Sequence, residues 1–248
     1  MTIHANKRIK LGLLLVLILL ALITAVIASG RARTASAAHL STVVCTTGPT
    51  FNLVTAKGYA TFPDGNTIFF WGFADSDSGG NFQYPSPTLC VNEGDTVTVN
   101  LTNTLDEPVS IVFPGQTAVS AVMTTGTGNA GLFTLEANPG ETVQYSFTAS
   151  QPGTYLYESG TLPFKHIQMG LFGAMVVRPA MDTATEHFAY NDASTEFNPE
   201  YEYLLLLHDI DPELHRAVEL GTAYDVTTKH DRYWTINGRS NPDTLFGN

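Results

Sequence analysis

Short segments rich in Val, Thr, Phe and Tyr follow one another from Phe51 to Val177, separated by Gly, Pro, Asn and Asp. Residues 96–101 (TVTVNL) alternate apolar and polar, which is typical of a strand with one buried face. Turn signals such as Pro63-Asp64-Gly65 separate the segments, and no helix-period run is longer than about two turns. The pattern predicts an all-β chain folded as an antiparallel sandwich or barrel.

The predicted strands are residues 51–62, 67–74, 96–103, 110–113, 131–136, 142–149, 153–159 and 170–177. Residues 180–199 are small and polar and are typical of a linker. A second strand set, EYLLLLHDID and RYWTINGRSNPDTL, begins after residue 199 and contains Asn237-Gly238, a strong hairpin signal. Only about 49 residues remain there, fewer than the roughly 100 of a second sandwich. Either the chain is a fragment or a short appendage packs on the first domain; we favour the fragment, because residues 204–207 and 233–236 need a covering sheet.

The first 38 residues differ from the rest in charge and hydropathy. They hold five of the 12 Lys and Arg residues, no acidic residue, and a run of about eighteen apolar residues after Lys10. This segment predicts either a secretory signal, cleaved at Ala35-Ser36-Ala37, or a retained membrane anchor. Both alternatives place the rest of the chain outside the cytoplasm, secreted or anchored to the membrane.

The exported part is strongly acidic. Without those five residues, 7 Lys and Arg remain against 23 Asp and Glu, a formal charge of −16 compared with −11 for the whole chain. Such a surface repels phosphate backbones and anionic lipid. We therefore expect no nucleic acid partner and contact with a membrane only through the N-terminal segment.

The chain has 2 cysteines, Cys45 and Cys90. In an oxidising compartment an even pair most simply forms one disulfide. The alternative is a thiolate ligand of copper, but neither cysteine is followed by the His and Met residues that a blue-copper site needs. We favour the disulfide.

Five segments in a fixed order resemble a known family. They are residues 85–116, 137–160, 168–179, 201–211 and 233–245. Together they resemble the first plastocyanin-like cupredoxin domain of multicopper oxidases and the start of the second. The resemblance implies a Greek-key β-sandwich at residues 39–179, a linker at 180–199, and an incomplete second cupredoxin-like domain at 200–248. It also implies a copper-dependent oxidoreductase.

In that family two histidine motifs supply four imidazoles to a trinuclear copper cluster. The resemblance places the first pair of ligands on Val112 and Pro114 and the second pair on Glu158 and Gly160. All four histidines are missing, and one carboxylate is a poor substitute for nitrogen ligands. We therefore predict no catalytic, cofactor-binding or metal residue within residues 1–248, no oxidase activity for this chain alone, and copper bound outside it.

Two histidine-containing segments offer other chemistry. His208, Asp209, Asp211 and His215 are potential ligands of a divalent metal, but at a strand end they more often act as caps and turn formers, and we favour that interpretation. His166 and Met169 suggest half of a mononuclear copper site. No cysteine or second histidine is near them in sequence, so we expect a surface histidine and a core methionine.

Two further features have a functional and a structural interpretation. Glu158 is a general base if burial raises its pKa, or, as we favour, a solvated loop carboxylate. The aromatic side chains between residues 69 and 82 form either a ligand patch for a hexose or polyphenol or, as we favour, part of the core. They are Phe69, Phe70, Trp71, Phe73 and Phe82.

Three functions are consistent with these observations. The first is an exported multicopper-oxidase-like oxidoreductase, whose copper ligands lie in later domains. The second is a non-catalytic cupredoxin-like extracellular binding or scaffold module. A single-copper electron carrier ranks lowest, because no Cys, His and Met triplet is present. The expected partners are later cupredoxin domains of the same or another chain, and further copies of this chain in a homo-oligomer.

Overall fold

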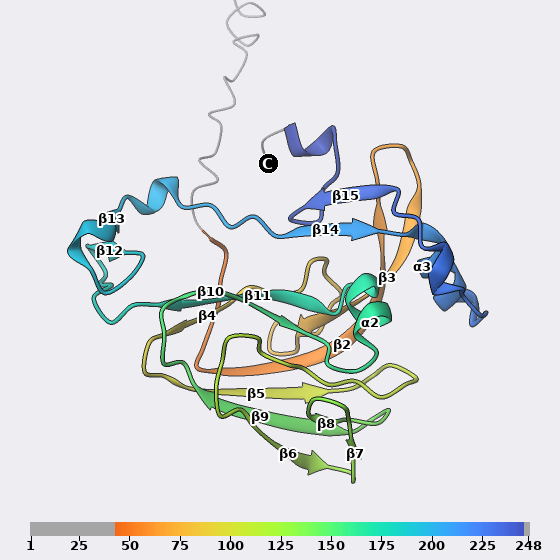
Figure 1. Ribbon diagram of the computed structural model, residues 1–248, viewed down its shortest axis with the longest axis horizontal. Helices are drawn as coiled ribbons and strands as arrows, with labels where there is room; N and C mark the ends of the chain where they lie inside the picture. The colour runs from red at the N-terminus through yellow and green to blue at the C-terminus, as the bar shows by residue number, and fades with distance from the viewer. Residues whose placement is uncertain (1–42, 246–248) are drawn as a thin grey trace, which may run out of the picture. The chain divides into compact units, whose positions relative to one another are not determined.

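The computed structural model describes residues 43–245, which belong to one compact unit. The predicted signal or anchor, residues 1–38, lies outside the described residues. Two sheets are stacked as a sandwich (Figure 1). The larger has the order β3 (Thr67–Asp75), β2 (Thr50–Thr61), β5 (Thr96–Thr102), β9 (Thr142–Thr148) and β6 (Ser120–Thr125). The smaller has the order β1 (Thr46–Thr47), β4 (Leu89–Asn92), β11 (Phe172–Arg178) and β10 (Gly153–Glu158).

The predicted β-sandwich is confirmed, but its pairing is mixed. Strands β2 and β5, β1 and β4, and β4 and β11 run parallel, whereas the other pairs of the two sheets are antiparallel. The prediction of an antiparallel sandwich was therefore wrong in this respect. Greek-key connections bring strands together that are not consecutive in sequence, and such neighbours need not alternate in direction.

Two of the predicted strands did not form as expected. Residues 110–113 contribute only one isolated bridge, at Val112, and a second isolated bridge lies just before them at Val109. Pro108 and Pro114 flank this stretch without an N–H to donate. In residues 131–136 only the last two residues form β8 (Leu135–Glu136), which pairs with β7 (Asn129–Ala130). The other predicted strands lie within a few residues of their expected ends.

The core lies between the two sheets. In β5 the buried residues are Val97, Val99 and Leu101, as the alternation predicted; Tyr145 of β9 lies beside Val99 in the same sheet, and Met175 comes from β11 of the other sheet. All five are 0% exposed. Full burial of a side chain of this kind stabilises a fold by roughly 1.5–3 kcal/mol, so this alternation determines the layer arrangement.

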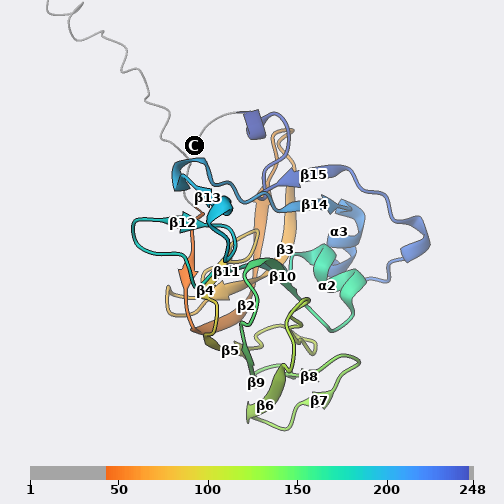
Figure 2. The ribbon, with the colours of Figure 1, turned by 60° about the vertical axis from the view of Figure 1, so that its left-hand side comes forward.

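The second strand set packs beside β3 and contains a helix that the pattern did not predict (Figure 2). Strands β14 (Leu207–Ile210) and β15 (Tyr233–Ile236) pair antiparallel, with helix α3 (Pro212–Leu220) between them in sequence. Helix α2 (Pro163–Met169) contacts both β3 and α3. No helix within residues 43–245 is long and apolar enough to cross a membrane.

The remaining elements are short. They are β12 (His187–Phe188), β13 (Glu196–Phe197), and the 3-10 helices η1 (Ala193–Thr195), η2 (Pro199–Tyr201), η3 (Val226–Thr228) and η4 (Asp243–Leu245). The predicted linker thus contains the hairpin-like pair β12 and β13, whereas the boundary between two domains stays a prediction. Asn237 and Gly238 have φ of 52° and 80° and connect the bonded pair Ile236 and Arg239, which confirms the predicted turn.

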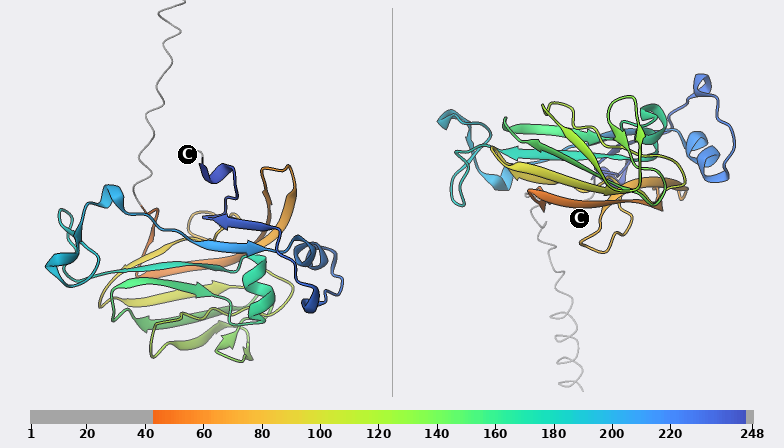
Figure 3. Two further views of the ribbon diagram at one scale, coloured as in Figure 1. Left: turned by 45° about the horizontal axis from the view of Figure 1, so that its top comes forward. Right: turned by 90° about the horizontal axis from the view of Figure 1, so that it is seen from below.

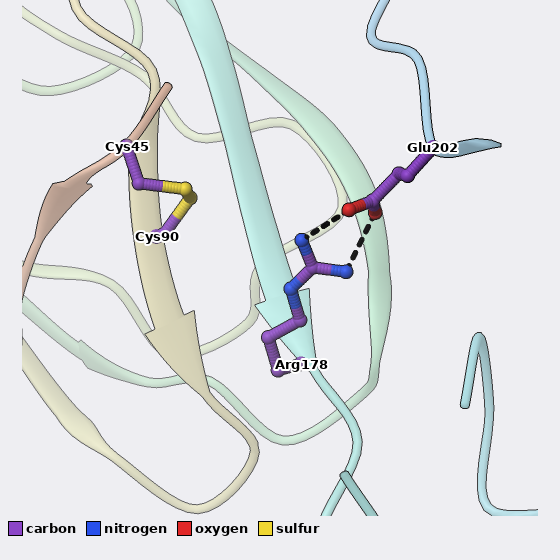
Figure 4. Close-up of a disulfide and its surroundings, with 4 residues drawn as sticks. All are labelled: Cys45, Cys90, Arg178 and Glu202. Atoms are coloured by element: carbon purple, nitrogen blue, oxygen red, sulfur yellow. Dashed lines mark hydrogen bonds and ion pairs between the residues drawn. A yellow bond between two sulfur atoms is a disulfide. The ribbon is translucent and has the colours of Figure 1, made fainter. Parts of the chain in front are cut away.

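Two links fasten neighbouring segments, before β1 and before β14, to the smaller sheet (Figure 4). Cys45 and Cys90 form a disulfide, as predicted, which joins the residue before β1 to β4. The Arg178 guanidinium at the end of β11 donates to both carboxylate oxygens of Glu202, at 2.6 and 2.8 Å. These bidentate bonds hold the segment that leads into β14 beside the sandwich, above the smaller sheet in the left view of Figure 3.

Candidate functional site

Three of the four positions that the resemblance assigned to copper ligands lie together at one edge of the smaller sheet. Val112 and Glu158 exchange backbone hydrogen bonds, with N to O distances of 2.8 and 3.1 Å. A Cβ atom added at Gly160 would lie 2.7 Å from Val112 Cγ1. Pro114 follows two residues after Val112 and is exposed. The fold thus brings positions from two distant segments to one place.

These positions do not fit a copper ion. Val112, Pro114 and Gly160 have no side-chain donor, and the space beside Gly160 is filled by a Val112 methyl group and, at 3.0 Å, by the Ser110 hydroxyl. Glu158 alone offers a carboxylate. Within residues 43–245 no three His, Cys, Asp or Glu side chains are grouped as metal ligands. Packing therefore fills the space at the positions that the resemblance assigned to copper ligands.

Glu158 ends β10 and is half-buried, so it is not the solvated loop carboxylate that the sequence favoured. Burial raises the pKa of its carboxyl above the usual value. Its side chain has no hydrogen-bond partner among the described residues, although its backbone is paired with Val112. General base catalysis needs a group positioned to receive or supply the proton, and no such group contacts Glu158.

A hydrogen-bonded network beneath this edge was not predicted. Thr161 Oγ1 donates to Glu136 Oε1 at 2.8 Å, so the Ser110 hydroxyl, 2.9 Å away, donates to Thr161. Ser159 Oγ lies 2.9 Å from His166 Nδ1 and 3.0 Å from the Thr161 carbonyl oxygen. Every hydroxyl beside Gly160 is therefore already bonded within the protein.

His166 is fully buried, and the prediction of a surface histidine was wrong. Helix α2 turns its imidazole inward, where Nε2 donates to Glu107 Oε1 at 2.6 Å. Lys165 Nζ donates to Glu107 Oε2 at 2.6 Å and lies 5.1 Å from the centre of the Trp71 ring. The prediction that Met169 is a core residue is confirmed.

Glu107 is the charged centre of this network. Burial alone raises its pKa, but hydrogen bonds from His166 and Lys165 outweigh burial and lower the pKa to about 2. Serine, histidine and glutamate are also the residue types of a nucleophilic triad. Ser159 is 0% exposed, however, so no substrate reaches it, and the network fixes the loop between β10 and α2 instead.

The segment LLLHDIDPELH is divided between β14 and α3. Asp211 is the N-cap of α3 and accepts from the Glu213 backbone N–H at 2.9 Å, which confirms the predicted capping role. His208 Nδ1 lies 2.6 Å from the Tyr84 hydroxyl, and His215 Nδ1 donates to the Phe69 carbonyl at 2.6 Å. These residues therefore join the second strand set to β3.

Burial is the main cause that lowers the pKa of both histidines, to about 4 in each case. Their Nε2 atoms are buried and have no hydrogen-bond partner among residues 43–245. For His208 the neighbouring His215 lowers the pKa further, because two imidazolium charges would repel each other. Both side chains are neutral at pH 7.

The aromatic residues of β3 are mainly core, as expected. Phe70 and Phe73 are 0% exposed, Trp71 is 5% exposed, and Phe69 packs against the core from its edge. Phe82 is half-buried beside Phe70 and covers Gly58, where an added Cβ atom would lie 2.1 Å from its ring. Their burial leaves little of the surface that a sugar or polyphenol patch needs.

Comparison with known proteins shows which family the sandwich is similar to. Residues 74–182 match the family model described as multicopper oxidase. An L-ascorbate oxidase of Cucurbita pepo var. melopepo is 40% identical over 106 residues, which cover 41% of this chain and 18% of that protein. A copper-containing nitrite reductase of Neisseria meningitidis is 36% identical over 126 residues, which cover 50% of this chain and 29% of that protein.

Solved structures show the same fold. The blue copper oxidase from Nitrosomonas europaea matches with a TM-score of 0.58 and 24% identity, over 78% of this chain and 54% of that one. The copper nitrite reductase from the same organism matches with a TM-score of 0.51 and 22% identity. This chain thus spans less than a third of the two curated relatives and about half of the solved ones.

Proposed function

We propose that this chain, whose residues 74–182 are a multicopper oxidase domain, is the N-terminal part of an exported multicopper-oxidase-like protein and holds no copper itself. The relatives are named L-ascorbate oxidase and copper-containing nitrite reductase, and residues 74–182 match the family model described as multicopper oxidase. From them the proposal takes only the reaction class, copper-dependent oxidation and reduction. The copper ligands then belong to residues outside this chain.

The observation that carries this proposal is the closed packing at the ligand positions. Val112 and Glu158 are adjacent, and a Val112 methyl group occupies the space into which a side chain at 160 would extend. A trinuclear cluster needs several nitrogen donors around an open space, whereas this edge offers one carboxylate and no space. The domain therefore contributes its rigid sandwich and its surface to the larger protein.

Export is supported by two features of the chain. The acid-free, basic and apolar segment at residues 1–38 has the composition of a signal or anchor. The disulfide between Cys45 and Cys90 uses both cysteines of the chain, and such bonds persist in oxidising compartments. Both features support a location of the sandwich outside the cytoplasm.

A second candidate function, a non-catalytic binding or scaffold module, is favoured by the same closed packing together with the exposed apolar face of β14 and β15. The two candidates differ in the copper content of the whole protein. The first predicts copper in the later domains, and the second predicts none.

Restoring the four histidines tests the assignment of the ligand positions. The variant V112H/P114H/E158H/G160H should retain about one or more copper ions per chain after dialysis, because it supplies four imidazoles at one edge. The change at Val112 also removes the methyl group that a histidine at 160 would strike. The matched control, V112A/P114A/E158A/G160A, changes the same positions without adding a nitrogen donor and should retain none. If the histidine variant folds, by circular dichroism, and retains no more copper than the alanine variant, these positions are not a ligand set.

A further inference from the structure

Tyr84 and His208 form a phenol–imidazole pair at the junction between the second strand set and the sandwich. Tyr84 lies in the loop between β3 and β4, and its hydroxyl is 2.6 Å from Nδ1 of His208 in β14. Between ring centres, Phe70 lies 4.3 Å from Tyr84, and Phe172 lies 4.5 Å from His208. Aromatic side chains therefore flank both members of the pair.

The partner of the Tyr84 hydroxyl differs from those of two other tyrosines in the core. Tyr145 and Tyr157 are both 0% exposed. Their hydroxyls donate to backbone carbonyls, of Leu135 at 2.8 Å and of Pro87 at 2.6 Å. A carbonyl accepts a hydrogen bond but does not take up the proton, whereas a neutral imidazole does. Of these three tyrosines, only Tyr84 has a base as its partner.

The Tyr84 hydroxyl donates to the imidazole. Thr235 Oγ1 also lies beside this hydroxyl, but it is 3.2 Å away, and its own proton is donated to the His208 carbonyl. The shorter contact with Nδ1 is therefore the stronger hydrogen bond. Burial lowers the pKa of His208 to about 4, so at pH 7 the ring is neutral and its Nδ1 accepts. The proton of Tyr84 thus points at a base.

Burial keeps this proton on Tyr84 until the ring loses an electron. It raises the pKa of the Tyr84 hydroxyl above the usual value, so no tyrosinate forms at neutral pH. Removal of the electron alone leaves a phenol radical cation, which is a strong acid and a charge in an apolar site. The electron and the proton therefore leave together, and the proton needs an acceptor that is already in place. His208 Nδ1 is that acceptor.

We propose that Tyr84 and His208 are a redox-active pair, in which Tyr84 gives one electron to an outer-sphere oxidant and its hydroxyl proton to His208 Nδ1. The O–H bond of Tyr84 breaks and an N–H bond forms, which leaves a neutral tyrosyl radical and an imidazolium. The oxidant is a one-electron metal complex of high potential, and it is reduced by one electron. When an electron returns to the radical, the proton moves back and the pair is restored.

The surroundings of His208 make the imidazolium short-lived. Asp209 favours the charged ring, whereas His215 and Lys229 oppose it, and burial opposes it most. The imidazolium therefore returns its proton as soon as an electron reduces the radical. The pair can thus hold one oxidising equivalent within this chain without a metal, which goes beyond the copper-dependent reaction class proposed above.

Flash oxidation of the full chain without copper tests this proposal. A ruthenium tris-bipyridine complex is excited by a laser flash and quenched by a cobalt(III) ammine, which generates the ruthenium(III) oxidant. We expect a tyrosyl radical, detected by EPR and by its visible absorbance, that outlasts the radicals of exposed tyrosines, because a ring held inside the protein does not couple with another. This long-lived radical should be lost in Y84F, which lacks the hydroxyl, and in H208Q, which lacks the base.

The matched control is Y157F, which removes a fully buried phenol bonded to a carbonyl and should keep the long-lived radical. Variants are checked for folding by circular dichroism, and H208N replaces H208Q if that variant fails. In the parent chain the radical should form more slowly in heavy water, because the proton moves with the electron. A long-lived radical in Y84F or H208Q, its loss in Y157F, an equal rate in heavy water, or no such radical in the parent chain would each overturn the proposal. Copper is absent throughout, so this result is independent of the copper assignment.

Discussion

Acidification from pH 6.5 to 4 should lower the free energy of unfolding by roughly 6 kcal/mol, because two buried histidines are neutral in the folded protein. Burial lowers the pKa of His208 and of His215 from the usual 6.5 to about 4. Each therefore accounts for about 3 kcal/mol of the loss by pH 4, at about 1.4 kcal/mol for each pH unit of the shift. Both lie where β14 and α3 meet β3, so their protonation weakens this junction.

The direction of this change in the free energy of unfolding follows from the number of protons that the folded and unfolded states bind. Below pH 6.5 the unfolded chain protonates both imidazoles, whereas the folded protein resists protonation until about pH 4. The unfolded state thus gains protons first, and stability is lost as the pH falls through this window. Glu107, with a pKa lowered from 4.5 to about 2, keeps its charge in the folded protein while the unfolded chain protonates it, so it adds to the loss only below about pH 4.5, at the acid end of this window. The raised pKa of Glu158 acts in the opposite direction, so it opposes the loss.

Urea denaturation at several pH values between 7 and 4 measures the effect. The protein should lose stability steeply, whereas H208Q and H215Q should each have a shallower pH dependence, by about one proton. The control is H230Q, which makes the same substitution at an exposed histidine. A flat curve for the parent chain between pH 6.5 and 4 would contradict this account of the junction.

Removing the disulfide should cost about 4 kcal/mol. The bond between Cys45 and Cys90 closes a loop of 45 residues, and the chain-entropy model gives a cost of this size for a loop of that length. The loop contains β2 and β3, which form one side of the larger sheet. Without the bond the unfolded chain gains freedom, and β1 keeps only its short parallel pairing with β4.

The double variant C45A/C90A tests this value by urea denaturation at pH 7. Its matched control is T47A, which truncates an exposed side chain in β1 and leaves the disulfide in place. We expect a loss of several kcal/mol for the double variant and less than about 0.5 kcal/mol for the control. A loss below about 1 kcal/mol for the double variant would show that the bond constrains the chain much less than its loop length implies.

Much of the fold was predictable because local alternation and burial agree. Residues 96–101 alternate between polar and apolar in the sequence and between exposed and buried in the structure. Asn237-Gly238 forms the tight turn that these two residue types favour. Helix α3 was not predicted, although Asp211 and Pro212 are a typical N-cap and first helical residue. The apolar run before them favoured a strand, and the strand ends at Ile210, directly before the cap.

The environment of His166 could not be predicted from its neighbours in sequence. Helix α2 has only seven residues, too few for a clear helical period, and the burial of His166 depends on Glu107, 59 residues away. The adjacency of Val112 and Glu158 likewise depends on the Greek-key connections. The resemblance to a known family assigned these positions to copper ligands. How their side chains pack could be seen only in the structure.

The copper content of the full chain after loading and dialysis tests the central claim most directly. The chain is incubated with copper, dialysed against a weak chelator, and analysed for metal and for blue-copper absorbance. We predict well under one copper per chain and no blue-copper band, because Val112, Pro114 and Gly160 offer no donor and packing fills the space between them. Retention of about one or more copper ions per chain would contradict the account.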